Sequence, residues 1–222
     1  MAEESGKSAM LRIRTKADLK AGVTALVSGC RHMARIHALA GEPPLRRRPT
    51  GFKGLSRVIV SQQLSVASAG AIWQRLEARV KPFTAASRLA VQQADLRAVG
   101  LSDGKTATLR RLAESIELGT LNLEALSDAP EAVIHGRLTE IKGIGPWSAD
   151  IYALFCLGRP DAWSPGDLAL QHAVRDALDL AERPSAKSMV DIAEVWRPWR
   201  SVAARMLWSY YAWRRKTSAA PA

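Results

Sequence analysis

The spacing of apolar residues along the chain predicts helices almost throughout. Apolar side chains recur every three or four residues, which places them on one face of an α-helix. In the run Lys105–Leu118, for example, Leu109, Leu112 and Ile116 share such a face. Comparable runs occur at Ala17–Ala25, Cys30–Ala40, Leu55–Ile59, Val66–Leu76, Asn122–Ala132, 146–157 and Leu168–Leu180. No useful length alternates apolar and polar residues as a strand would, so the sequence predicts an all-α fold.

The most informative stretch is residues 138–167, which begins with a glycine turn, Lys142–Gly145, between two helical runs. Glycine permits a positive φ and lets another backbone approach closely. Backbone N–H groups at such a turn, next to the start of a helix, can hold a phosphate without a charged side chain. An ordinary corner between two packed helices explains the same residues, and the turn alone leaves both interpretations open.

Asp167 closes this stretch, directly before the predicted helix Leu168–Leu180. An aspartate in that position commonly caps a helix, which contributes about 1 kcal/mol. A chemical role is the alternative. Trp147 and Trp163 bracket the segment, and aromatic faces beside a carboxylate would form a pocket for a flat, electron-poor base.

A second stretch of interest interrupts two apolar helical runs with the polar loop Ser61–Ser65. Glutamines followed by an exposed leucine suit a wedge that enters a DNA groove and fills the space left by a displaced nucleotide. The alternative is a helix cap at Ser65 with the glutamines facing water.

Charge points to an anionic partner. The 222 residues include 32 Lys+Arg and 21 Asp+Glu, a net charge of +11, which favours nucleic acid. The run Arg46–Arg48 either contacts phosphates or forms a solvated loop. The length suits a single domain over residues 1–222, or two closely packed lobes, and we expect the first dozen residues to be flexible.

Other features bound the setting of the protein. The two cysteines, Cys30 and Cys156, fit a reducing compartment and are too few for a four-cysteine iron–sulfur cluster. The sequence has no apolar run of transmembrane length and no signal-peptide pattern. We therefore expect a cytoplasmic protein, nucleoid-associated if bacterial, that does not contact membranes.

Three motifs in order make the sequence recognisable. The segment LTEIKGIGPWSADIYALFCLGRPDAWSPGD (138–167) resembles the helix-hairpin-helix and Gly/Pro–Asp signature of the base-excision DNA glycosylase superfamily. Within it, the sequence is most similar to the 3-methyladenine DNA glycosylase II branch. Residues 56–76 and 196–213 resemble the DNA-inserting segment and the C-terminal helix of that branch. The resemblance implies a two-lobed helical fold with the active-site cleft between the lobes and the hairpin at about 138–157.

The resemblance also implies a role for individual residues. Asp167 matches the catalytic aspartate, and Gln63 or Leu64 matches the side chain inserted into DNA. The implied base pocket consists of Trp147, Trp163 and Trp208. The implied DNA-binding residues are Gln62, Ser65, Lys142, Gly143, Ile144 and Gly145. No catalytic metal is implied, although the hairpin carbonyls could hold Na⁺ or K⁺ against a DNA phosphate.

The implied activity is the excision of alkylated purines, such as 3-methyladenine and 7-methylguanine, from double-stranded DNA by a monomer. Members that also cut the strand carry a lysine that forms a Schiff base; Trp147 stands at that position, so we expect no lyase activity. Gly166 replaces a second Asp that can occur before the catalytic one. Two alternatives stay open: a non-catalytic helix-hairpin-helix DNA-binding module, and a glycosylase for a deaminated or oxidised base.

Overall fold

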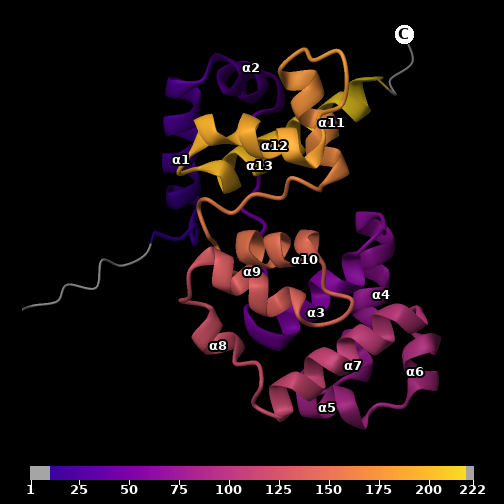
Figure 1. Ribbon diagram of the computed structural model, residues 1–222. Coiled ribbons are helices and arrows are strands. Elements are labelled where there is room, and N and C mark those ends of the chain that lie inside the picture. The colour runs from indigo at the N-terminus through magenta and orange to yellow at the C-terminus, as the bar shows by residue number, and fades with distance from the viewer. Residues whose placement is uncertain (1–10, 219–222) are drawn as a thin grey trace, which may run out of the picture.

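The computed structural model describes residues 11–218, and within that range the chain is helical and contains no strand. The prediction of an all-α fold is confirmed. The predicted flexible N-terminal segment falls almost entirely outside the described residues. Figure 1 shows the helices in two groups, one above the other in that view.

The upper group, which we call the terminal lobe, joins the two ends of the described chain. It contains α1 (Lys16–Gly29), α2 (Arg31–Ala40), α11 (Leu168–Ala177), α12 (Ala186–Ala193), the 3₁₀ turn η2 (Glu194–Trp196) and α13 (Arg200–Ser218). Helix α13 packs against α1, α2 and α11. Helix α13 approaches α1 so closely that a Cβ on Gly22 would lie only 2.6 Å from Val202 Cγ2. The lobe is therefore built from segments more than 120 residues apart in the sequence.

The lower group, the middle lobe, is formed by consecutive helices. These are α3 (Gly51–Ser61), α4 (Val66–Arg79), α5 (Ala85–Ala90), α6 (Gln93–Ala98), α7 (Asp103–Glu117), α8 (Leu123–Leu126), α9 (Glu131–Thr139) and α10 (Pro146–Tyr152). Leu109 and Leu112 of α7 are buried as predicted. The predicted helix Asn122–Ala132 is instead two helices, because Pro130 precedes α9 and disfavours helical geometry in the residue before it.

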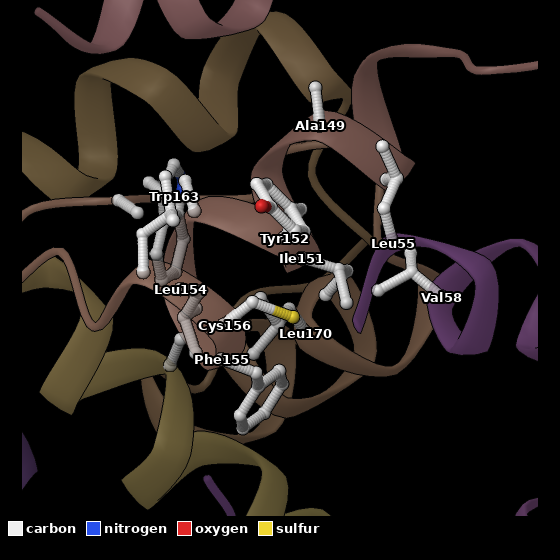
Figure 2. Packing of buried hydrophobic residues seen from close by; sticks show 14 of the residues in the cluster. Leu55, Val58, Ala149, Ile151, Tyr152, Leu154, Phe155, Cys156, Trp163 and Leu170 are labelled. Carbon is white, nitrogen blue, oxygen red and sulfur yellow. The ribbon is translucent and has the colours of Figure 1, made fainter. Parts of the chain in front are cut away.

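The lobes meet at a π-helical turn, η1 (Ala153–Leu157), that continues α10. The predicted helix 146–157 is thus confirmed in extent but changes type at Ala153. Figure 2 shows Tyr152, Leu154 and Phe155 of this segment packed among buried residues that include Leu55 and Val58 of α3. On the other side, Arg205 of α13 donates from Nη2 to the Leu154 carbonyl at 3.0 Å. This π-helical turn therefore contacts both lobes and connects α10 to the terminal lobe.

Candidate functional site

Asp167 is held where the two lobes meet, by three N–H donors. Its Oδ1 accepts from the Leu170 backbone at 2.9 Å, so it caps α11 as its sequence position predicts. The indole Nε1 of Trp147, in α10, donates to Oδ2 at 2.8 Å. The indole Nε1 of Trp208, in α13, donates to Oδ1 at 3.2 Å. The carboxylate is only half-buried, so the same group both caps a helix and faces an accessible site.

Trp208 forms one wall beside this carboxylate. Its ring stacks on Phe155 with centroids 5.4 Å apart and an interplanar angle of 25°. The guanidinium of Arg205 lies over the same Phe155 ring, 4.5 Å from its centroid. Both Trp147 and Trp208 are half-buried, which leaves part of each ring available to a ligand.

Trp163 lies in the core, contrary to its predicted place in the base pocket. It is 7% exposed, its Nε1 donates to the Met189 carbonyl at 3.0 Å, and its ring packs edge-on against Trp196. Figure 2 shows it among the buried residues beside Leu154. The indole thus points into the core, where its N–H is hydrogen-bonded.

One of the two glycines in the turn has the positive φ that the sequence suggests. Gly143 has a φ of +102°, whereas Gly145 has a φ of −94° and caps α10, with Pro146 as the first helical residue. The residues Leu138, Ile141 and Ile144 are buried, so Ile144 offers only its backbone to a ligand. Lys142, Gly143 and Gly145 are exposed.

The loop between α3 and α4 is fastened to this turn. Gln62 Nε2 donates to the Gly143 carbonyl at 3.0 Å and to Ser148 Oγ at 2.8 Å. Gln63 is exposed with a φ of +53°, and Leu64 is 40% exposed. Ser65 caps α4 by accepting from the Ser68 backbone, as its alternative interpretation predicts. The two segments proposed to contact DNA are thus one connected surface.

Lys105 is a supporting residue whose position sequence reasoning did not reveal. Its Nζ donates to the carbonyls of Val60 and Gln62, both at 2.8 Å, at the end of α3. Burial lowers the pKa of this ammonium. The partners lie more than 40 residues away, so no local pattern could have identified them.

A second group of titratable side chains lies on another face of α10. A cavity of about 290 Å³ is lined by Asp150, His135, Glu131 and Trp163 among others, but not by Trp147, Asp167 or Trp208. Burial raises the pKa of Asp150 to about 7, and Glu131 adds to the shift. His135 Nε2 lies 3.8 Å from Asp150 Oδ1. No signal in the sequence distinguished this group.

Two findings concern the described part of the chain, residues 11–218. It contains no cluster of three or more His, Cys, Asp or Glu side chains placed to hold a metal ion. None of its helices combines the length and apolar character that crossing a bilayer requires.

A helical hairpin is thus followed by an aspartate that caps the next helix where the lobes meet, which is the arrangement that the resemblance to base-excision DNA glycosylases implies. Comparison with known families specifies the superfamily: residues 56–198 match the HhH-GPD superfamily base excision DNA repair protein family. The chain belongs to this superfamily, as the three motifs implied.

Several relatives carry names from the alkylbase branch. The chain is 30% identical over 164 residues to DNA-3-methyladenine glycosylase 1 of Schizosaccharomyces pombe, covering 71% of each protein. A solved DNA-3-methyladenine glycosidase from Bacillus halodurans is 31% identical, with a TM-score of 0.75 over 88% of this chain and 91% of that one. The S. pombe enzyme in complex with abasic DNA is 26% identical, with a TM-score of 0.78 over 85% and 95%. The chain spans about two fifths of the length of relatives from Bacillus subtilis and Mycobacterium tuberculosis.

Proposed function

We propose that this protein is a monofunctional DNA glycosylase that excises alkylated purines from double-stranded DNA in base excision repair. The observation that carries the proposal is the carboxylate of Asp167, presented between the indoles of Trp147 and Trp208. Membership of the superfamily and the names of the relatives support the reaction class and the lesion class.

The proposed chemistry follows from the charge that develops on the sugar. The bond between C1′ and the base nitrogen breaks, and the base leaves with the electron pair, so positive charge grows on the sugar ring. A carboxylate nearby stabilises that charge and orients a water molecule, whose oxygen then bonds to C1′ and whose proton is released. A base such as 3-methyladenine is already cationic and leaves as a neutral molecule. The reaction therefore needs no separate strong acid to protonate the leaving base.

The base would reach this carboxylate only after its nucleotide is turned out of the helix. Trp147 and Trp208 are the pocket residues in our proposal, since an electron-poor, cationic base stacks on indole faces with about 0.5–2 kcal/mol. Gln63 or Leu64, exposed at the α3–α4 loop, would fill the gap left in the duplex. Trp147 at the position of the Schiff-base lysine means that the abasic strand stays uncut.

The hairpin would hold the DNA without reading its sequence. Backbone amides of Gly143 and Gly145, together with the exposed Lys142, would bind phosphates, and the turn carbonyls would hold a monovalent cation against one of them. We propose that a monomer performs the reaction on chromosomal DNA in the cytoplasm.

The test is base release from methylated duplex DNA by the wild type and by Asp167→Asn. Asparagine caps helices as well as aspartate does, so the variant should fold and bind DNA but release no base. Asp128→Asn, which removes an exposed carboxylate in the α8–α9 loop, is the matched control and should remain active. Free 3-methyladenine or 7-methylguanine with uncut abasic sites supports the proposal. DNA binding by the wild type without any base release would contradict it and favour a non-catalytic module.

A further inference from the structure

The run Arg46–Arg48 separates into three different environments. Arg48 is half-buried, with its guanidinium 5.5 Å from the centroid of Phe155. Arg47 is exposed and donates to the Arg14 carbonyl at 3.4 Å. Arg46 is exposed and forms no hydrogen bond or ion pair with any described residue. Of the three, Arg46 is therefore the exposed arginine whose side-chain donors are all unpaired among the described residues.

The backbone at Arg46 is strained, and its side chain is exposed. Its φ is +44°, in the left-handed region that non-glycine residues rarely adopt. Such strained conformations are concentrated at functional sites. The strained residue lines a small depression together with Phe155, Arg205 and Trp208. Because Trp208 is bonded to Asp167, Arg46 lies at the margin of the proposed active site.

The charges around this depression are unbalanced. Arg205 is 3% exposed, and burial, with a further contribution from Arg46, lowers its pKa to about 10. Its Nη atoms donate to the carbonyls of Leu45 and Leu154, whereas its Nε is buried without a hydrogen-bond partner among the described residues, as is Nη1 of Arg48.

Within residues 11–218, no carboxylate forms an ion pair with Arg46, Arg48 or Arg205. Clustered like charges repel one another, so an anion at this place would be bound favourably. The depression itself is too small for a base, at about 10 Å³. The anion would thus meet the exposed guanidinium of Arg46 at its rim.

We propose that Arg46 binds a backbone phosphate of the DNA strand that carries the flipped nucleotide. The inference rests on the proposed function, because it needs DNA seated with its deoxyribose at Asp167. The phosphates that flank that sugar are the anions nearest to the reacting centre. A guanidinium suits them because its planar donors match phosphate oxygens in pairs.

The experiment measures DNA affinity as a function of salt. The probe is a duplex with a tetrahydrofuran abasic analogue, which cannot be processed, titrated by fluorescence anisotropy between 50 and 200 mM KCl. Each phosphate contact contributes about −0.9 to the slope of log affinity against log salt. Across this range, the wild type should therefore lose about threefold more affinity than Arg46→Ala.

Two further variants make the result specific. Arg110→Ala removes an exposed arginine paired with Glu114 on α7 and should keep the wild-type slope. Arg46→Lys keeps the charge and should retain most of the slope. A neutral methylphosphonate is then placed at each position flanking the analogue. At one of these positions, the methylphosphonate should weaken DNA binding by the wild type and have no further effect on DNA binding by Arg46→Ala.

The outcomes separate this inference from the proposed function. An unchanged slope for Arg46→Ala, with tight binding by both proteins, would overturn the phosphate contact alone. A loss of affinity in Arg46→Ala at unchanged slope would overturn it in favour of a contact that involves no phosphate charge. A wild type that neither binds the duplex nor releases alkylated bases would overturn the proposed function and this inference together.

Discussion

Replacing Gly143 with alanine tests whether the glycine turn depends on close packing against α7. Two features oppose a side chain there. The φ of +102° is one that L-residues rarely adopt, and a Cβ would overlap Thr108 Oγ1 while lying 3.0 Å from Thr108 Cβ and Cγ2. Thr108 is buried, and its Oγ1 donates to the Gly104 carbonyl at 2.9 Å. The threonine therefore cannot turn away without losing that bond.

The two features give separable costs. A left-handed backbone costs a non-glycine residue roughly 1–2 kcal/mol. Overpacking a buried contact adds about 1–3 kcal/mol. The expected loss of unfolding free energy is therefore about 2–5 kcal/mol, or roughly 5–15 °C in Tm for a chain of this size.

A double-mutant cycle distinguishes these contributions. Thermal and urea unfolding are measured for Gly143→Ala, Thr108→Ala and the double variant. Removing Oγ1 relieves the overlap but leaves the backbone strain, so we expect about 1–2 kcal/mol of favourable coupling. Gly145→Ala is the matched control, because its φ is −94° and nothing lies within 4 Å of a Cβ there. Equal losses for the two glycine variants, or additive effects in the cycle, would refute the packing argument.

Three further predictions follow from the site. Lys105→Met should lower the free energy of unfolding by about 1–3 kcal/mol, because two carbonyls lose a charged donor. Faster amide exchange at residues 62–65 would reveal this loss. Lys142→Met, at an exposed site, should have no such effect. The pKa of Asp150, raised from 3.8 to about 7, means that the folded protein holds its proton more tightly, so wild-type stability falls as pH rises from about 4 to 7. The Tm advantage of Asp150→Asn should therefore grow across that window and stay constant above it; a flat difference in Tm would contradict the shift. Trp163→Phe should lower Tm, through the lost bond to the Met189 carbonyl, yet leave base release at wild-type rate, and a catalytic loss as large as that of Trp208→Phe would restore Trp163 to the pocket.

The helices were predictable because their signals are local. The spacing of Leu109 and Leu112 fixes which face of α7 turns inward, whatever that face packs against. The change to π-helix at Ala153 had no such signal, since the turn is held by contacts from another lobe, such as that between Arg205 and Leu154. The division of Asn122–Ala132 into two helices, by contrast, has a local signal in Pro130, which the spacing of apolar residues alone does not reveal.

The site was predictable to the extent that its residues follow motifs. Asp167 and Trp208 came from two motifs about 40 residues apart in the sequence, and the structure joins them by a hydrogen bond. Trp163 was misplaced because its nearness to Asp167 in the sequence does not decide which way the indole points. Gln62 and Lys105 act through bonds to distant backbone carbonyls, which depend on how the helices finally pack.

The terminal lobe also determines the order in which the protein can fold as it is synthesised. The helices of the middle lobe find their partners within residues 51–152, so they can pack as they leave the ribosome. Helices α1 and α2 emerge first, but the core positions Leu19, Val23, Met33 and Ile36 are buried in a lobe that needs α13. At ribosomal speeds this delay is on the order of ten to thirty seconds. Trp208 reaches Asp167 only when α13 docks, so a nascent chain acquires its complete site as one of its last steps.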